Sequence, residues 1–529
     1  MSIATGSSKP LSQVGGTPRL QLIGQRCGVN GNQGAIGATN PYLYMHQRIL
    51  LPYGADAIQL VYPNFYMTLT GAGEKALPPS MFSAATVTYS GGTSYAVGDI
   101  DTFATTNTTA IAPVKVMITA VSAGVPTSVQ IIDGGLYNTE LAAGVSPAST
   151  SGSGTGATAT FTWAAGGMGA HIGIEPVWNT QVFSGQNSVE LASKGYLADG
   201  LDNWNLLVPV GDFLVTDIIA IDVPVGGAIA LRVGCGYNTI QAQRLPMTST
   251  YSPTAPSANY ERAAIGSTYF EVANTGTLNT SATSYLVQPI AILGIPKIQG
   301  PSVMAFGDSR CCMTATGTNA LSGNFDPLDV DGNISWFEKA LSQTVGIAFW
   351  PWSNMSIGGD KLAGAFPANS TLAGRQGRLK AIAMAQPTAV YVGLNVNDIN
   401  AAVSLATVQA QEQQLIGELK GLGVKYVFTD TTDPWTTSSD SWATAGNQTT
   451  TSGSANITAR NAALRAKTWA TYDFFIDQSP NTESSVGSGK WASNGTANAV
   501  TGDGHHASPA LITLKAAAAA AKMAASISI

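Results

Sequence analysis

From residue 302 onward, short apolar runs alternate with stretches of helical periodicity, and this alternation restricts the fold more than any other feature of the chain. Each run has the length and composition expected of a strand in a parallel sheet covered on both faces. The runs are SVMAFGD, GIAFWPW, TAVYVGL, KYVFTD and YDFFID, and the predicted helices span 334–343, 372–384, 406–421, 457–469 and 509–525. Residues 302–529 are therefore predicted to form a doubly wound α/β domain.

The residues before this domain have a different pattern, which predicts a multidomain protein. Apolar runs such as AIQLVYPNFYM and GGAIALRVGCGY are bounded by Gly, Pro and Asn, as is typical of antiparallel strands. Residues 41–83 plus 166–295 are predicted to form a jelly-roll-like β-sandwich. Residues 84–165 alternate Val and Thr around Gly-centred turns and predict a small inserted β-module. Residues 1–40 lack periodicity and are either a flexible arm or an extended segment ordered by a neighbouring subunit.

Charged side chains are scarce, at 11% of the 529 residues, and the formal net charge is −6. The 25 Lys and Arg residues are spread thinly, so nucleic acid is not an expected partner. Low charge with 58 glycines is typical of a β-rich extracellular or particle-borne protein. Residues 1–16 contain no basic segment followed by an apolar one, so no Sec signal peptide is expected. Residues 509–529 are interrupted by lysines, which favours a packed helix over a membrane span.

Two patterns that often mark metal sites are incomplete. The chain has four cysteines without a CxxC pair, which argues against a zinc site and a disulfide framework: Cys27, Cys235, Cys311 and Cys312. We interpret them as thiols packed mostly in cores. Residues 329–333, DVDGN, are similar to the start of a calcium loop, but Ala340 stands where such a loop needs a bidentate Glu. A helix N-terminal turn is the better interpretation, and neither metal nor cofactor is expected.

A serine with a candidate base stands at one edge of the predicted sheet. Ser309 follows the first predicted strand, at the carboxyl end where open α/β sheets place their sites. A serine hydroxyl needs a base, usually imidazole, and the four histidines are His46, His171, His505 and His506. The first two fall in the β-region and are interpreted as structural. Asp503 precedes His506 by three residues, a spacing at which its carboxylate can reach Nδ1, whereas His505 lacks such a partner. We predict a triad of Ser309, His506 and Asp503.

Gly307-Asp308-Ser309 and, near the other end of the domain, Asp503-Gly504-His505-His506 resemble the motifs of the SGNH (GDSL-type) hydrolases. The resemblance covers residues 302–529. It implies a flavodoxin-like fold and an ester hydrolase whose oxyanion hole comprises the N–H of Ser309, a glycine N–H and an asparagine side chain.

The two remaining donors of the oxyanion hole are carried over from two further blocks. NMSIGGDKL is similar to the second block of the family and places Gly359 at the donor position. VYVGLNVNDIN is similar to the third block, in which Asn397 and Asp398 match. Asn395 replaces the glycine of the family pattern and is an alternative donor. Trp350 and Trp352 beside the second block are either core residues or a wall for stacking sugars.

Resemblances outside this domain suggest a substrate. The segment 84–165 resembles a β-rich repeat of bacteriophage tail-associated proteins, and the predicted sandwich resembles one that precedes the catalytic domain in some SGNH hydrolases. Together with the low charge, they predict an O-acetyl esterase acting on acylated surface polysaccharide, on a virion tail or outside the cell, in a homo-oligomer or virion assembly. Two alternatives stay open: a structural or receptor-binding virion protein with a relic hydrolase domain, and a bacterial lipase or thioesterase.

Overall fold

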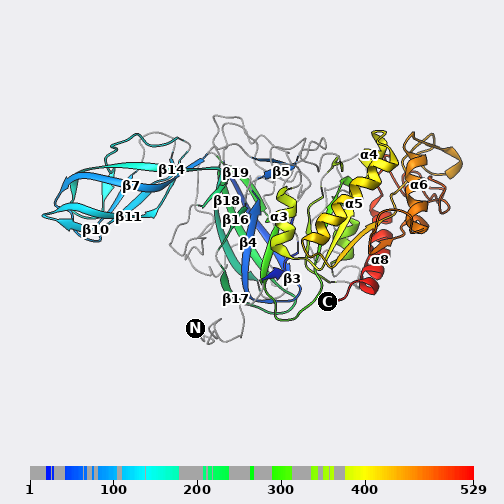
Figure 1. Cartoon of the computed structure of the whole chain (residues 1–529), viewed down its shortest axis with the longest axis horizontal. Coiled ribbons are helices and arrows are strands. Elements are labelled where there is room, and N and C mark those ends of the chain that lie inside the picture. The colour runs from blue at the N-terminus through cyan, green and yellow to red at the C-terminus, as the bar shows by residue number, and fades with distance from the viewer. Residues whose placement is uncertain are drawn as a thin grey trace.

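Figure 1 shows the chain as a computed structural model. It describes residues 20–25, 27–28, 42–63, 65–67, 74–76, 81–103, 110–137, 139–177, 206–209, 213–216, 218–236, 262–266, 289–312, 335–342, 349–356, 358–362 and 376–529. Residues 329–333 and most of the predicted N-terminal arm lie outside these ranges, as do the side chains of His46, His171, Cys235 and Cys312.

The C-terminal region contains a six-stranded parallel sheet. Its strands, in spatial order, are β2 (Cys27–Gly28), β22 (Trp352–Asn354), β21 (Val303–Gly307), β23 (Ala389–Gly393), β24 (Tyr426–Asp430) and β27 (Phe474–Ile476). All neighbouring pairs are parallel. Leaving out β2, the chain order across the sheet is 2-1-3-4-5, which is the flavodoxin-like doubly wound topology. The strand order reverses between β21 and β23, and ligands bind at the carboxyl edge of such a switch point.

Helices cover both faces of this sheet because strand side chains alternate between the faces. Met304 and Phe306 pack on one face with α3 (Gln376–Ala385) and α5 (Leu405–Gly421). Val303 and Ala305 pack on the other face with α2 (Trp336–Ala340) and α8 (Pro509–Ser526). The remaining helices are α1 (Ser309–Cys312), α4 (Val396–Asn400), α6 (Ser454–Arg465), α7 (Ser479–Thr482) and η5 (Ala445–Asn447).

Side-chain caps start three of these helices. Ser404 and Ser508 accept from the backbone N–H groups of Thr407 and Leu511, which begins α5 and α8. Ser335 starts α2 through a reciprocal capping box with Glu338.

Three features of this domain differ from expectation. The helix predicted over 457–469 spans Ser454–Arg465, because the chain leaves the helix at Lys467, whose φ is +57°. The second strand begins at Trp352, whereas the apolar run 346–352 was predicted to form it. Polar side chains are accommodated there because Ser353 Oγ donates to the Ile290 carbonyl oxygen at 2.6 Å. Within the predicted arm, β2 joins the parallel sheet, and the buried Gln25 donates from Nε2 to the carbonyl oxygens of Leu341 and Trp350 at 2.8 and 2.9 Å.

The described residues before this domain include two antiparallel sheets of five and eight strands. The five-stranded sheet comprises β1 (Gln21–Leu22), β20 (Ala291–Ile295), β4 (Ala55–Pro63), β16 (Phe213–Val215) and β17 (Ile219–Val223). The eight-stranded sheet comprises β19 (Arg262–Gly266), β3 (Tyr42–Leu51), β18 (Gly227–Gly236), β14 (Thr155–Val177), β7 (Met81–Thr93), β12 (Leu136–Tyr137), β9 (Ala110–Ala112) and β15 (Leu206–Pro209). That these sheets form a sandwich stays a prediction.

The segment 84–165 projects from the rest of the protein (Figure 1). It contains a sheet of β11 (Val125–Asp133), β10 (Val114–Ser122), β8 (Ile100–Phe103) and β13 (Ser149–Thr150). The paired strands β7 and β14 run without interruption from the eight-stranded sheet into the module. An aromatic core fills it, with Phe103 in edge-on contact with Phe161 at 5.0 Å between ring centroids.

Two hairpins lie outside the sheets given above. One pairs β5 (Phe65–Met67) with β6 (Glu74–Ala76), and the other pairs β25 (Thr436–Ser438) with β26 (Gln448–Thr450).

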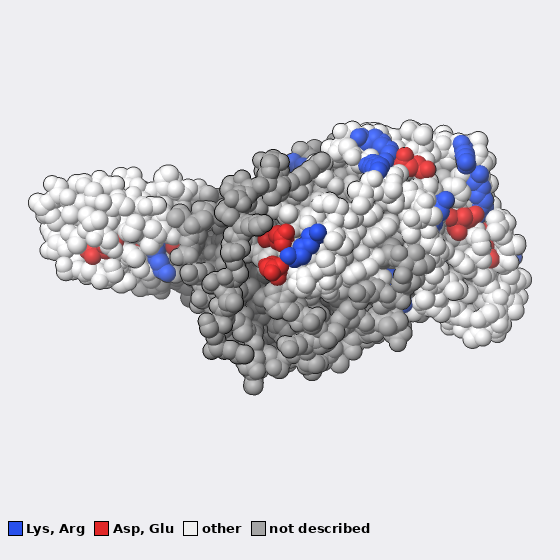
Figure 2. Space-filling view, turned by 90° about the horizontal axis from the view of Figure 1, so that it is seen from below, with Lys and Arg blue, Asp and Glu red and all other residues white. Residues whose placement is uncertain are grey.

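Among the described residues on the face shown in Figure 2, charged side chains are sparse and of both signs. Among the described residues, Lys297 bridges Asp56 and Asp222 at 2.7 and 2.6 Å. None of the described helices combines the length and the apolar character that a membrane crossing requires.

Candidate active site

The predicted nucleophile lies at the carboxyl end of β21. Ser309 is the first residue of α1, and the residue is almost fully buried, at 9% relative exposure. The tight turn into α1 is held by Asp308, whose Oδ1 accepts from the Arg310 backbone N–H at 2.9 Å. This turn presents the Ser309 hydroxyl at the sheet edge next to the switch point.

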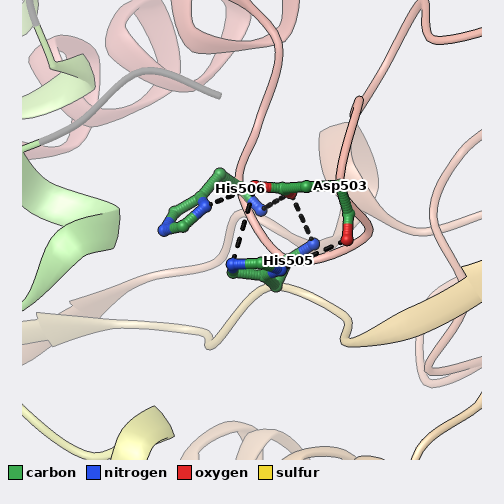
Figure 3. A group of neighbouring side chains, drawn as sticks. All are labelled: Asp503, His505 and His506. Atoms are coloured by element: carbon green, nitrogen blue, oxygen red, sulfur yellow. Dashed lines mark hydrogen bonds and ion pairs between the residues drawn. The ribbon is translucent and has the colours of Figure 1, made fainter. Parts of the chain in front are cut away.

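The predicted base and its carboxylate lie on the loop before α8. Asp503 Oδ1 accepts from the backbone N–H groups of His505 and His506 at 3.0 and 2.9 Å. Asp503 Oδ2 lies 2.7 Å from His506 Nδ1 (Figure 3). Because both carboxylate oxygens are engaged, Asp503 fixes the backbone of the loop and the imidazole together.

The loop and the nucleophile meet in one hydrogen bond. His506 Nε2 lies 2.9 Å from Ser309 Oγ, although the two residues are 197 positions apart in the chain. With Nδ1 donating to Asp503, Nε2 carries the lone pair and accepts the serine proton. The structure thus places Ser309, His506 and Asp503 in the order that nucleophilic catalysis requires.

A glycine makes possible the loop of residues 503–506, which we call the histidine loop. Gly504 has φ +82°, and a Cβ at this position would overlap the carbonyl oxygen of Thr436. Its own carbonyl oxygen accepts from Trp491 Nε1 at 2.8 Å and from the Thr436 N–H at 3.0 Å. The backbone is therefore fixed two residues before the base.

The neighbouring charges favour one ionic form of the pair. Burial alone would raise the pKa of Asp503, but hydrogen bonds from the His506 ring and from the His505 and His506 N–H groups hold it well below its usual value. Burial lowers the pKa of His505 to about 4, so this second imidazole is neutral near pH 7. Asp503 is therefore a carboxylate facing His506, and His505 adds no competing charge.

Asp503, His505 and His506 also offer three metal-ligand atoms within 4.8 Å of one another. However, His506 Nδ1 is engaged by Asp503 and His506 Nε2 by Ser309. A metal bound by His506 would have to replace one of these two hydrogen bonds. We therefore interpret the cluster as a site for proton transfer.

The two predicted oxyanion donors follow the strands on either side of β21. Gly359 follows β22 and has φ +77°, a conformation that favours glycine. Asn397 lies in α4 directly after β23, and its Nδ2 donates to the Asp360 carbonyl oxygen at 2.9 Å. The alternative donor, Asn395, is buried, and its Oδ1 accepts from Thr432 Oγ1 at 2.9 Å. This contact ties the amide oxygen of Asn395 to the segment after β24 and does not involve its Nδ2.

Buried contacts that the sequence pattern did not indicate hold the loop of Gly359. Arg378 Nη1 lies 2.7 Å from Asp360 Oδ2, and both side chains are fully buried. The Arg378 guanidinium lies 3.9 Å from the ring centroid of Phe306, within cation–π distance. Asp398 Oδ2 accepts from the Leu362 N–H at 2.7 Å. The second and third blocks are thus tied together by buried contacts.

The two tryptophans beside the second block pack on the core of the α/β domain. Trp352 is 2% exposed in the cluster that includes α2 and α8, and the half-buried Trp350 packs against the same cluster. Trp352 is therefore a core residue, and a sugar-stacking role is not available to it.

Asp308 is expected to make folding stability fall as pH rises. Burial raises the pKa of this carboxyl to about 7, so the folded protein binds a proton more tightly than the unfolded chain does. The stabilisation that this proton provides is fully present below the pKa of Asp308 in the unfolded chain. It is lost as the pH rises through the pKa of Asp308 in the folded protein. When the pH is raised from about 5 to about 8, the wild-type protein should lose about 2–3 kcal/mol of unfolding free energy relative to Asp308→Asn, which has no carboxyl to titrate at this position.

Chemical denaturation at both pH values measures this difference. The asparagine side chain can still accept from the Arg310 N–H, so the turn is kept. Glu140 is exposed, and Glu140→Gln controls for the loss of one negative charge. A gap between Asp308→Asn and wild type that stays constant with pH would contradict the raised pKa.

No protein-family model matches the chain, and a search of curated proteins finds no match. The chain is similar to the solved structure of a carbohydrate acetylesterase from Sinorhizobium meliloti, at 16% identity and a TM-score of 0.30, over 43% of this chain and 99% of that one. A lipase/acylhydrolase from Enterococcus faecalis shows 14% identity and a TM-score of 0.29, over 43% and 98%. A family 3 carbohydrate esterase from Talaromyces cellulolyticus shows 15% identity and a TM-score of 0.28, over 43% and 100%. At such low TM-scores, function must be inferred from the geometry of the site.

Proposed function

We propose that this protein is a serine esterase that transfers an acyl group to Ser309 and then to water. The observation that carries the proposal is the chain of contacts from Asp503 Oδ2 through His506 to Ser309 Oγ, at 2.7 and 2.9 Å. A serine, an imidazole and a carboxylate in this sequence of contacts activate the hydroxyl for attack on a carbonyl carbon.

Each residue has one role in the proposed reaction. His506 Nε2 takes the Ser309 proton during attack and returns it to the leaving oxygen. Asp503 keeps Nδ1 protonated and stabilises the imidazolium that forms. The N–H groups of Ser309 and Gly359 and the Asn397 amide are the proposed donors to the oxyanion. A water activated by the same imidazole then releases the acid and frees Ser309.

The substrate that we propose is an O-acetyl group on surface polysaccharide, and the proposed location is a phage tail or the extracellular space. Low charge, the β-rich N-terminal region and the projecting module at 84–165 support this assignment. The module would hold the catalytic domain against a polymer chain. Among the alternatives, a lipase or thioesterase would use the same triad, and a relic virion protein would not.

Labelling with a fluorophosphonate tests the esterase itself. This reagent reacts with an activated serine, so Ser309 should carry the label, and hydrolysis of p-nitrophenyl acetate should fall in proportion to labelling. The label should be absent after unfolding, which separates activation from simple exposure. A folded protein that neither takes the label nor hydrolyses p-nitrophenyl acetate faster than buffer would support the relic alternative.

A substrate panel then separates the two kinds of esterase. Acetate release from O-acetylated polysaccharide and from p-nitrophenyl acetate should exceed release of octanoate and palmitate from the matching esters. The reverse order would support the lipase or thioesterase and overturn the acetyl assignment.

A further inference from the structure

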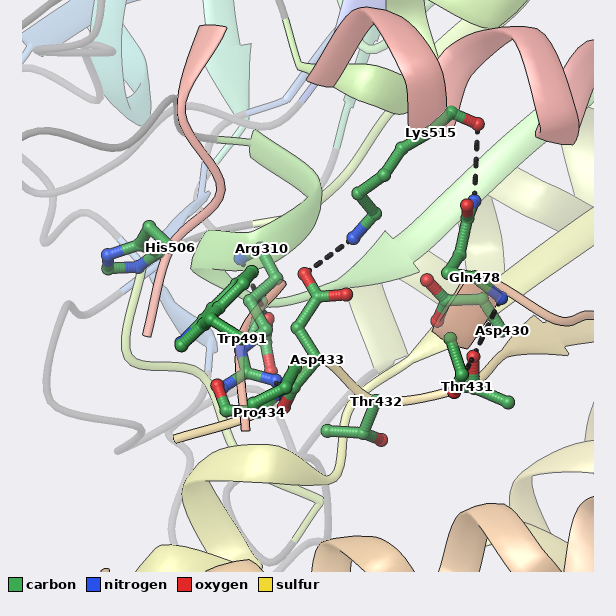
Figure 4. Close-up of polar contacts among 12 residues, drawn as sticks. Arg310, Asp430, Thr431, Thr432, Asp433, Pro434, Gln478, Trp491, His506 and Lys515 are labelled. Atoms are coloured by element: carbon green, nitrogen blue, oxygen red, sulfur yellow. Dashed lines mark hydrogen bonds and ion pairs between the residues drawn. The ribbon is translucent and has the colours of Figure 1, made fainter. Parts of the chain in front are cut away.

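Arg310, the residue directly after the nucleophile, contacts the segment that follows β24. Its Nη1 donates to the carbonyl oxygen of Asp433 at 2.6 Å, and its Nη2 donates to that of Pro434 at 3.3 Å. Hydrogen bonds from a charged, planar guanidinium to two consecutive carbonyls restrict both partners. We call residues 433–436 the bracket segment; Figure 4 shows Arg310 beside its first two residues.

The bracket segment also contacts the loop that carries the base. Trp435 stacks on His505, with ring centroids 4.8 Å apart and planes inclined by 16°. The Thr436 N–H donates to the Gly504 carbonyl oxygen at 3.0 Å. Gly504 and His505 directly precede His506, so these contacts determine where the imidazole lies. Both halves of the triad are therefore held against the same short segment.

A buried ion pair fixes the bracket segment to the last helix. Lys515 Nζ lies 2.6 Å from Asp433 Oδ2, and the two side chains are 1% and 2% exposed (Figure 4). Moving either residue away would leave a charge unpaired in the core, so the pair tolerates little displacement. Lys515 lies on α8, which starts just after the histidine loop. Asp433 therefore connects α8, through its side chain, to Arg310, through its carbonyl oxygen.

We propose that Arg310, Asp433 and Lys515 are positioning residues that hold Ser309 Oγ and His506 Nε2 at hydrogen-bonding distance through the bracket segment. This inference rests on the proposed function, because it concerns the same triad. Its physical basis is the steep dependence of proton transfer on geometry, since a misplacement of about 1 Å can cost about 100-fold in rate. Arg310 keeps the serine turn in place, and Asp433 with Lys515 keeps the segment in place.

Substitution of Arg310 tests the first contact. Arg310→Ala should lower kcat for p-nitrophenyl acetate by about 10- to 100-fold and leave KM within about threefold. Fluorophosphonate labelling of Ser309 should slow by the same factor. Arg310→Lys should recover part of the loss, because one ammonium reaches one carbonyl. Added guanidinium chloride should also raise the rate of Arg310→Ala above that in equal sodium chloride.

Arg465→Ala is the matched control. Arg465 is also partly buried, and its Nε donates to Asp477 Oδ2 at 2.9 Å. Asp477 lies outside the bracket segment. Its removal should lower stability and leave kcat near the wild-type value. Arg310→Ala that folds and keeps kcat within about threefold would overturn the inference while the proposed function stands. Wild-type protein without labelling or hydrolysis would instead overturn the proposed function, and this inference with it.

A double-mutant cycle tests the second contact. Asp433→Asn alone leaves the Lys515 charge buried and can prevent folding, so Asp433→Asn is combined with Lys515→Met. If both sets of contacts act through the bracket segment, Arg310→Ala should cost much less kcat in this background than in the wild type. Losses that simply multiply would show independent effects and overturn the shared role.

Discussion

Replacing Ser309 by alanine is expected to lower kcat for p-nitrophenyl acetate by about 10⁴- to 10⁶-fold. The substitution removes Ser309 Oγ, the proposed nucleophile, which lies 2.9 Å from His506 Nε2. What remains is stabilisation of the oxyanion and substrate binding, which alone accelerate hydrolysis by about 10³- to 10⁴-fold over water. Fluorophosphonate labelling should disappear as well, because no activated hydroxyl is left.

Folding is expected to survive this substitution. Ser309 is small, and alanine fits the first position of α1, so the unfolding free energy should change by at most about 1–2 kcal/mol. Ser302→Ala is the matched control, since Ser302 is a buried serine just before the other end of β21, where its Oγ accepts from the Thr388 N–H at 3.4 Å. That variant should keep wild-type kcat. Equal rates for Ser309→Ala and wild type would remove the basis of the esterase proposal.

The order of elements in the α/β domain was predictable because strands buried on both faces of a sheet have a recognisable apolar sequence. Strands buried on both faces read as apolar runs, and β21, β23, β24 and β27 all lie within predicted runs. The serine caps of α5 and α8 mark their starts within a residue of prediction. His506 could be singled out because histidines are scarce and Asp503 stands at a fitting spacing.

Contacts between distant segments were not predictable in this way. The second strand, β22, contains Ser353 and Asn354, and its polar side chains find partners only in the folded protein. The strand β2 is two residues long, too short to show a period, and it is recognisable only by its pairing with β22. Arg310 resembles any surface arginine in sequence, because a guanidinium bound to backbone carbonyls needs no particular residue type opposite it.

Replacing Asp503 by asparagine is expected to lower kcat by about 10⁴-fold while leaving the fold intact. Oδ1 of the new side chain can still accept from the His505 and His506 N–H groups, which orients the amide so that Nδ2 takes the place of Oδ2. Nδ2 is a donor, so His506 Nδ1 must become the acceptor, and the ring proton moves to Nε2. Nε2 then cannot accept the proton of Ser309.

A control substitution separates the effect of the wrong His506 tautomer from the effect of losing one negative charge. Asp477→Asn removes a half-buried carboxylate whose pKa is also lowered, despite the opposing effect of burial, by hydrogen bonds from Arg465. It should reduce stability without reducing kcat by more than about threefold. Steady-state rates, with the His506 ring protons followed by NMR, measure both effects. If Asp503→Asn kept more than about a tenth of wild-type kcat, orientation of His506 by Asp503 would contribute far less than a triad requires.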